Sequence, residues 1–305
     1  MPRAYTSERK EPVSKKITLF CMTEKGYRVL ETIISYSPEI IECVVSSRDP
    51  NIGQDYYDQI STLCKANDIL FYSRSVIKEI HSPIAIAVSW RWLIQPASST
   101  LLVFHDSILP KYRGFAPLVS ALINGEKRIG VTALIASDKY DCGDIIAQST
   151  RSIEHPIKIA EAIKIIHENY KEITIEVLDA ITNGIPLNGV RQNESKASYS
   201  LWLDESDYHI DWSKNAEYIL RFIYAVGAPY KGAFTLLDGK KARVLDAKII
   251  DEVCIENRTP GKVIYIEESK PVVVCGKGLL MLLNLVDDET QKPLLPLTKL
   301  RTRFE

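Results

Sequence analysis

The sequence predicts an α/β domain with a mostly parallel sheet over residues 16–185 and a small, mainly antiparallel β-barrel over residues 200–305. In the first half, short apolar runs alternate with segments of helical periodicity, as in parallel α/β domains. Near residue 185 the chain becomes polar and irregular. Beyond that point, short alternating strands with turn signals between them indicate a barrel.

The elements of the first domain follow in order from the spacing of apolar residues. Apolar runs predict buried strands over residues 17–22, 40–45, 84–89, 101–104 and 131–136. Apolar residues at helical spacing predict helices over residues 27–36, 56–67, 116–123 and 157–183. Pro156 and Gly184 flank the longest helix, as helix termini prefer. This alternation indicates a parallel sheet that is covered on both faces.

The second half begins with residues 186–199, which we interpret as a linker. A predicted helix over residues 216–226 precedes five predicted strands, at residues 233–236, 242–249, 261–266, 272–274 and 279–285. At the other end of the chain, residues 1–15 are basic and lack the apolar region of a signal peptide. We interpret them as a flexible tail.

The overall composition argues against several classes of protein. The 305 residues carry 38 Lys and Arg against 39 Asp and Glu, so the net charge is −1 and a protein built mainly to hold nucleic acid is disfavoured. The six cysteines are dispersed and the five histidines do not cluster with them, so we expect no metal site and free thiols in a reducing compartment. No apolar run approaches 18 residues, and we therefore expect a cytoplasmic protein.

The most informative stretch is Phe104–Gly114, with the sequence FHDSILPKYRG. His105 directly follows a predicted buried strand, which places it at the carboxyl edge of the sheet, where open α/β folds bind their ligands. Pro110 and Gly114 then fix the conformation of the loop that follows. Taken alone, a single histidine at such a position is more often structural than catalytic.

A second loop, Asp138–Ile146, also follows a predicted strand. Gly143 permits a close backbone approach or a positive φ. A carboxylate such as that of Asp141 raises the basicity of a neighbouring imidazole and fixes its tautomer. For this loop alone, a turn with solvated aspartates is the simpler explanation.

Together the two loops resemble the folate-dependent formyltransferases, which include methionyl-tRNA formyltransferase, glycinamide ribonucleotide transformylase and the sugar N-formyltransferases. The family pattern of a histidine loop followed by A-P, I-N-G, G-V-T and D-x-G motifs is present in order over about 40 residues. The matching positions here are His105, Ser107, Leu109-Pro110, Gly114, Ala116-Pro117, Ile123-Asn124-Gly125, Gly130-Val131-Thr132 and Asp141-Cys142-Gly143. Residues 210–212 and 227–234 resemble the carboxy-terminal barrel of the family, so the likeness spans roughly residues 16–290.

This resemblance implies a Rossmann-like first domain, an OB-like barrel, and transfer of a formyl group from 10-formyltetrahydrofolate without a metal. His105 would stabilise the developing charge and handle the amine proton, while Asp141 would orient His105 and support proton movement to the folate nitrogen. The same resemblance assigns the folate site to the loop after the third strand and to the second loop. These residues are Ser89, Trp90, Arg91, Trp92, Leu93, Ile94, Asp138 and Asp141.

The sequence departs from the family at Val103, where most members carry an asparagine whose amide donates to the oxyanion. Losing one oxyanion donor typically reduces the rate about 10²–10³-fold. Ser89 and Ser107 are the nearby hydroxyls that could replace this donor, and such a replacement is the interpretation we favour. A catalytically impaired homologue that binds folate or a nucleotide sugar stays an alternative.

The acceptor is expected to be a nucleotide-linked amino sugar, in the biosynthesis of lipopolysaccharide or another surface glycan. The stretch 46–58 holds three Asp and one Arg, and residues 200–305 hold 15 Lys and Arg against 16 Asp and Glu, which does not suit RNA. The resemblance suggests that the acceptor contacts Ser107, Lys111, Arg113, Gly114, Trp202 and Tyr230. A methionyl-tRNA formyltransferase or a formyltetrahydrofolate hydrolase would also be consistent with the family motifs. A homodimer is expected as well, since sugar enzymes of this family are often dimers.

Overall fold

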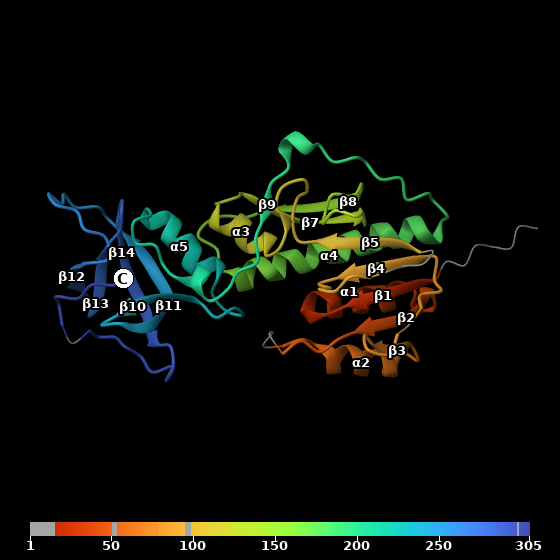
Figure 1. Ribbon diagram of the computed structural model, residues 1–305, viewed down its shortest axis with the longest axis horizontal. Helices are drawn as coiled ribbons and strands as arrows, with labels where there is room; N and C mark the ends of the chain where they lie inside the picture. The colour runs from red at the N-terminus through yellow and green to blue at the C-terminus, as the bar shows by residue number, and fades with distance from the viewer. Residues whose placement is uncertain (1–15, 51–53, 78, 95–98, 298) are drawn as a thin grey trace, which may run out of the picture.

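The computed structural model describes residues 16–50, 54–77, 79–94, 99–297 and 299–305, so the proposed tail over residues 1–15 lies outside the described residues. A seven-stranded sheet and a five-stranded sheet form two parts that lie end to end (Figure 1). Both predicted parts of the fold class are thereby confirmed. Among the described residues, no helix is long and apolar enough to cross a membrane.

The large sheet has the strand order β3-β2-β1-β4-β5-β7-β8. The first five are parallel neighbours, β7 is antiparallel to β5, and β8 is antiparallel to β7. Their bounds are β1 Ile17–Cys21, β2 Ile41–Ser46, β3 Leu70–Ser73, β4 Ile84–Val88, β5 Thr100–His105, β7 Arg128–Ile135 and β8 Ile145–Ser152. The strands β3 and β8 were not predicted, because both lie at sheet edges and mix exposed with partly buried residues.

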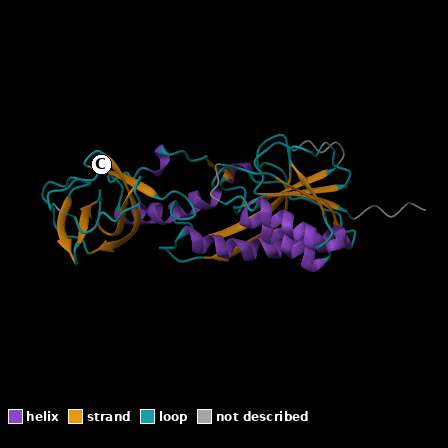
Figure 2. Ribbon diagram, turned by 90° about the horizontal axis from the view of Figure 1, so that it is seen from below, coloured by secondary structure: helices purple, strands orange, loops and turns teal. Residues whose placement is uncertain are grey.

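Among the described residues, helices cover one face of this sheet and not the other. The helices α1 (Thr23–Tyr36), α2 (Tyr57–Ala66) and α4 (Ile159–Thr182) pack together there (Figure 2). Coil covers the opposite face, where Phe20, Val45 and Ala87 form an apolar cluster. The expectation of helices on both faces is therefore wrong, because the described residues of the β3–β4 and β4–β5 links form no helix. Loops therefore cover the second face.

The smaller sheet forms the predicted antiparallel barrel, in the order β10-β11-β14-β13-β12. Its strands are β10 Ala233–Leu237, β11 Lys240–Ile250, β12 Val263–Glu267, β13 Lys270–Val274 and β14 Leu279–Asp287. Phe304 bridges to Leu237 and Arg303 bridges to Lys262. These bridges close the gap between the edge strands β10 and β12. The helix α5 (Ala216–Ala225) packs against β11.

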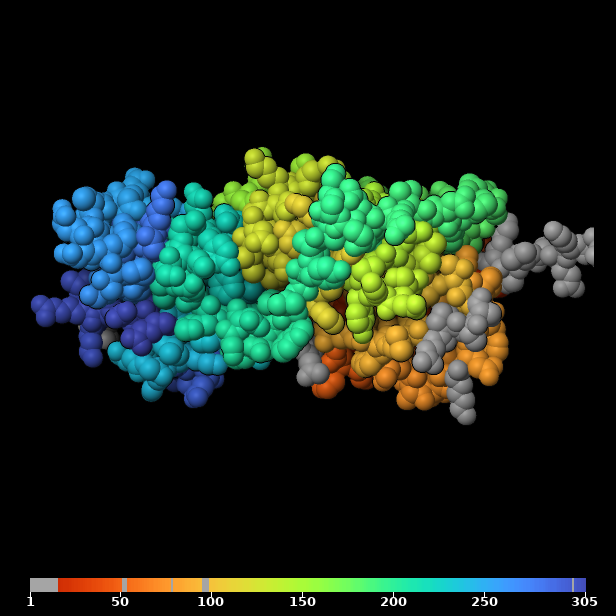
Figure 3. Space-filling view, turned by 45° about the horizontal axis from the view of Figure 1, so that its top comes forward, coloured from red at the N-terminus to blue at the C-terminus, as the bar shows by residue number. Residues whose placement is uncertain are grey.

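Residues 186–199 pack against the α/β part along much of their length. Val190 forms an antiparallel bridge with Ile145, and Gln192 is buried. The short strand β9 (Tyr199–Ser200) pairs with β6 (Arg113–Gly114), which lies in the loop after His105. Figure 3 shows this segment crossing the surface of the α/β part towards the barrel. The predicted linker therefore contributes to the histidine loop.

The two parts are also joined by polar contacts between helices. Lys158, just before α4, donates to Asp246 of β11 at 2.8 Å, and Tyr224 of α5 donates to the same carboxylate at 2.7 Å. Arg221 of α5 donates to the Ile123 carbonyl at the end of α3 (Pro117–Ile123) at 2.9 Å. Short 3-10 turns at Pro38–Ile40, Glu194–Lys196 and Ser206–Tyr208 complete the elements.

Candidate active site

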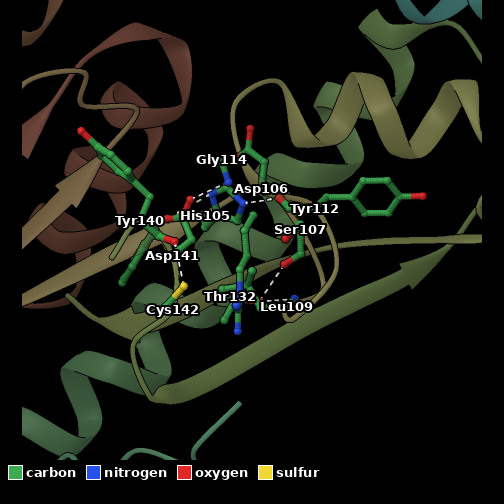
Figure 4. A network of polar contacts seen from close by, with 12 residues as sticks. His105, Asp106, Ser107, Leu109, Tyr112, Gly114, Thr132, Tyr140, Asp141 and Cys142 are labelled. Atoms are coloured by element: carbon green, nitrogen blue, oxygen red, sulfur yellow. Dashed lines mark hydrogen bonds and ion pairs between the residues drawn. The ribbon is translucent and has the colours of Figure 1, made fainter. Parts of the chain in front are cut away.

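His105 is the last residue of β5 and lies almost completely buried at the carboxyl edge of the large sheet. Its Nε2 lies 2.8 Å from the carbonyl oxygen of Tyr112, seven residues further along the same loop. A carbonyl can only accept a hydrogen bond, so Nε2 carries a proton in this arrangement. Figure 4 shows the ring held between the Tyr112 segment and Asp141.

The other ring nitrogen of His105 faces the carboxylate of Asp141, with 3.7 Å between Nδ1 and Oδ1. The second oxygen of Asp141 accepts a hydrogen bond of 2.8 Å from the Gly114 amide, which fixes the carboxylate in place. A ring that carries a proton on both nitrogens would direct one to each acceptor. The structure therefore brings together the two residues singled out in the separate sequence loops.

The loop that presents Asp141 depends on an unusual backbone. Asp141 has φ 54°, in the left-handed region that non-glycine residues seldom adopt. A Cβ at Gly143 would lie 1.7 Å from the Ile135 carbonyl oxygen, so this position admits only glycine. Gln192 donates to the carbonyls of Asp141 and Gly143 at 2.7 and 2.8 Å. The predicted linker thus holds the aspartate loop in shape.

Ser107 supports the histidine loop from within. Its buried hydroxyl donates to the Lys111 carbonyl at 2.8 Å, and its own carbonyl accepts from Thr132 of β7 at 2.7 Å. Gln148 of β8 donates to the Leu109 carbonyl at 2.8 Å. In this structure the Ser107 hydroxyl holds its own loop, and its contact with the acceptor stays a prediction.

Arg113 also has a structural environment, and its contact with the acceptor stays a prediction. Its side chain is 0% exposed, and its guanidinium donates to Gln192 at 2.9 and 3.1 Å and to Glu194 at 2.8 and 2.9 Å. The hydrogen bonds that Arg113 donates to Glu194 raise the pKa of Arg113, so the side chain stays charged. By contrast, Lys111 is exposed and paired with Glu126 at 2.7 Å.

A buried ionic cluster behind His105 was not found in the sequence. Asp106 points to the helix-covered side and forms an ion pair with Lys25 of α1 and a hydrogen bond with Tyr170 of α4. Burial alone would raise the pKa of Asp106, but the charge of Lys25 outweighs it and lowers the pKa. Burial likewise opposes the charge on Lys25, yet Asp106 raises its pKa. Both groups are thus held in their charged forms.

The residues after β4 lie at the carboxyl edge beside this centre. Ser89 turns the chain with φ 52°, and Trp90 folds back so that its ring meets Phe20 edge-on, with centroids 5.2 Å apart. Trp92 packs edge-on against Trp90, and Arg91 pairs with Asp49 at 2.8 Å. Of the remaining residues assigned to the folate site, Ile94 packs against the apolar cluster, while Leu93 and Asp138 are exposed.

Val103 lies on the coil-covered face of β5 and packs against the cluster that contains Phe20 and Ala87. It is paired with Ala87 of β4, and Ala87 with Phe20 of β1. Side chains alternate along a strand, so Val103 and His105 point to the same face. An apolar side chain therefore stands where the family carries a hydrogen-bond donor.

Aromatic and aliphatic side chains are exposed beside the two loops. The pairing of β6 with β9 brings Phe115 next to residues 199–202, and the Phe115 ring lies 6.4 Å from that of Tyr140. Trp202 is 62% exposed and Tyr140 78% exposed, whereas Tyr230 is less open. We name as the aromatic rim the exposed residues Phe115, Tyr140, Tyr199, Leu201 and Trp202. Trp202 is the one member of this set among the acceptor contacts that the resemblance suggests.

Two family models match the chain: formyl transferase over residues 88–178, and the formyl transferase C-terminal domain over residues 203–296. The methionyl-tRNA formyltransferase of Carboxydothermus hydrogenoformans is 33% identical over 256 residues, covering 82% of this chain and 80% of that protein. The methionyl-tRNA formyltransferase of Syntrophomonas wolfei is 32% identical over 181 residues, which cover 59% of this chain and 57% of that protein. Matches to several further curated relatives also span a little over half of the relative's length.

Solved structures share this fold at low sequence identity. The N-formyltransferase from Helicobacter canadensis, solved with folinic acid and dTDP-3-aminofucose, has a TM-score of 0.67 at 17% identity and covers 88% of this chain and 98% of that one. Methionyl-tRNA formyltransferase from Clostridium thermocellum has a TM-score of 0.54 at 15% identity, and the match covers 77% of this chain and 93% of that one. At these identities the likeness concerns the fold alone.

Proposed function

Because the chain belongs to the formyl transferase family, we propose that it transfers a formyl group from 10-formyltetrahydrofolate to the amine of a nucleotide-linked amino sugar. The observation that carries the reaction is the placement of His105 between the Tyr112 carbonyl and the Asp141 carboxylate. Acyl transfer of this kind needs a cationic or proton-donating group beside a carboxylate. His105 stands at the carboxyl edge of the sheet, and the loop between β7 and β8 brings Asp141 beside it.

In the proposed reaction, the acceptor amine attacks the formyl carbon and gives a tetrahedral oxyanion. The new carbon–nitrogen bond of the product forms, the bond to N10 of the folate breaks, and the amine proton is transferred to N10. His105 stabilises the developing negative charge and handles the proton in transit. Asp141 orients the imidazole and balances its charge, since its other oxygen is fixed by the Gly114 amide.

The aromatic rim supports a nucleotide-linked acceptor. It lies beside the histidine and aspartate loops, because β6 follows the histidine loop directly and pairs with β9. Exposed rings stack on nucleobases, and every base offers a π face. The exposed Trp202 and Tyr140 are the rings best placed to do so. Tyr199 is less free, since its ring lies over the Arg113 guanidinium at 5.8 Å.

A transfer-RNA acceptor is the second candidate, and the sequence relatives favour it, since they are named methionyl-tRNA formyltransferases. One observation supports the sugar instead. Three basic side chains of the barrel, those of Lys231, Lys241 and Arg243, converge on Glu205, and Arg243 also pairs with Asp288. RNA binding depends on basic groups that are available to phosphates.

The test is a turnover assay with 10-formyltetrahydrofolate against a panel of nucleotide-linked amino sugars, followed by tetrahydrofolate release and product mass. A product with one added formyl group supports the proposal and identifies the acceptor. The Trp202→Ala variant should then raise KM for that acceptor about tenfold, whereas Leu300→Ala, an exposed aliphatic residue at the far end of the barrel, should not. Activity on charged initiator transfer RNA alone would instead establish the second candidate.

A further inference from the structure

Trp90 occupies an unusual position at the carboxyl end of β4. The left-handed residue Ser89 reverses the chain, and the indole then lies back on Phe20 of β1. Trp92 meets it edge-on, with ring centroids 5.2 Å apart at 73°. Two edge-on aromatic neighbours hold the Trp90 ring in one orientation.

The indole Nε1 of Trp90 is buried and has no hydrogen-bond partner among the described residues. Buried tryptophans normally find an acceptor for this group. Trp212 in the barrel is an example, since its Nε1 donates to Thr235 at 3.0 Å. A buried donor without a partner destabilises the folded protein, so its persistence at the edge of a ligand site suggests that a ligand supplies the acceptor.

The Trp90 ring lies on the same face of the sheet as His105. Phe20, Ala87 and Val103 are paired across β1, β4 and β5 and belong to one apolar cluster. Trp90 packs against this cluster, and His105 is two residues beyond Val103 on the same strand. This cluster therefore holds a buried, unpaired N–H together with the apolar side chain of Val103.

We propose that the Trp90 indole N–H donates a hydrogen bond to the bound folate that carries the formyl group. Trp90 thereby supplies a side-chain N–H on a face of the sheet where Val103 has none. The flat bicyclic ring of a folate carries a carbonyl oxygen and ring nitrogens that accept such a bond. Its edge fits beside a ring that is already fixed by Phe20 and Trp92. This inference rests on the proposed function, since it names a contact within the same site.

The proposal predicts a loss of binding without a matching loss of stability. Trp90→Phe keeps an aromatic ring against Phe20 but removes the unpaired N–H. In the free protein, Tm should stay within a few degrees of the wild type, since no hydrogen bond is lost. In the complex, a hydrogen bond is lost, so the Kd for tetrahydrofolate or 5-formyltetrahydrofolate should rise about tenfold. A purely structural role would instead lower Tm and leave binding by the folded fraction unchanged.

The experiment is calorimetric titration of the full chain with 5-formyltetrahydrofolate, with thermal unfolding of each variant in the absence of ligand. The matched control is Trp212→Phe, which removes the indole N–H that donates to Thr235 in the barrel and should leave Kd within about twofold. If the wild type binds and Trp90→Phe binds equally well, the inference is overturned while the proposed function stands. If the wild type binds no folate, the proposed function itself fails.

A second measurement does not depend on the folding of the Trp90 variant. The chain has four tryptophans, so four indole N–H signals are expected from 15N-labelled protein, and single Phe variants at positions 92, 202 and 212 assign the Trp90 signal by elimination. Addition of 5-formyltetrahydrofolate should shift that signal strongly downfield and slow its exchange with water. A Trp90 signal that keeps its position at saturating ligand would refute the contact.

Discussion

Lys25 and Asp106 form a buried ion pair directly behind His105, with the carboxylate also bound by the Tyr170 hydroxyl. The pair joins α1 to the end of β5, so it fixes the point from which the histidine loop departs. Its two partners come from segments far apart in the sequence. The ion pair therefore forms only when the chain folds, and the sequence around His105 alone does not reveal it.

Removal of one partner of this ion pair should lower the free energy of unfolding strongly. Lys25→Met leaves the Asp106 carboxylate buried without its countercharge, and the free energy of unfolding should fall by about 3–5 kcal/mol. The double variant Lys25→Met with Asp106→Leu should recover much of that loss, because no buried charge remains. Urea unfolding of the three proteins measures the difference. Equal stability of the single and double variants would contradict the buried-pair interpretation.

Replacement of either central residue should abolish turnover without unfolding the chain. His105→Ala and Asp141→Ala should each reduce kcat/KM for the formyl transfer at least about a hundredfold, because the charge stabilisation and proton transfer that we assign to them are lost. His81→Ala and Asp251→Ala are exposed controls of the same residue types and should retain activity. Near-normal turnover in either central variant would remove it from the mechanism.

Arg113 should act on stability rather than on acceptor binding. Lysine cannot reproduce the forked contacts to Gln192 and Glu194, so Arg113→Lys should lower the free energy of unfolding by about 2–4 kcal/mol. The KM for the acceptor should change little at temperatures where the variant is folded. A large rise in KM with unchanged Tm would instead restore a role in acceptor binding. Thermal unfolding and initial rates distinguish the two.

Glu205 should make the barrel sensitive to acid. Burial alone would raise its pKa, but hydrogen bonds from Lys241, Arg243 and Lys231 lower it to about 2. Because the pKa of Glu205 is lower in the folded state, its ionised carboxylate stabilises the protein at pH values above the unfolded-state pKa near 4.5. That stabilisation is lost as the pH falls through about 2. Because the Glu205 side chain is a third exposed, we expect its charge to contribute about 1–2 kcal/mol to the free energy of unfolding at pH 7.

The matched variant for this prediction is Glu205→Gln, which keeps the size of the side chain but cannot ionise. Wild type should be more stable than the variant at pH 7, and the gap should fall to roughly half or less by pH 3. Urea unfolding at the two pH values provides the comparison. A gap that is equal at pH 7 and pH 3 would mean that the charge of Glu205 contributes nothing.

Much of the fold followed from local sequence, because buried strands such as Ile17–Cys21 and Ile84–Val88 are continuous apolar runs. The edge strand β8 was missed, since most of its residues over Ile145–Ser152 are polar and most are exposed or only partly buried, as in a loop. His105 and Asp141 were identified together through their ordered motifs. The structure confirms that they adjoin, although their catalytic roles stay a prediction.

The remaining parts of the site were beyond sequence reasoning because they depend on contacts between distant segments. Gln192 and Glu194 looked like a solvated linker, yet they enclose Arg113 and support the Asp141 loop. Arg113 itself looked like an exposed loop cation. Trp90 was assigned to the folate site through its backbone, whereas its unpaired side-chain donor is visible only after folding.

The uneven cover of the large sheet has a consequence for how this chain can change over evolutionary time. Substitutions under α1 and α4 disturb close packing between helix and strand, and most of them reduce stability. Loops tolerate insertions and exchanges far better. Since the proposed folate contacts and the aromatic rim both belong to coil segments, ligand preference can diverge while the helical side stays fixed. One face of the sheet thus preserves the fold, and the other is open to new acceptors.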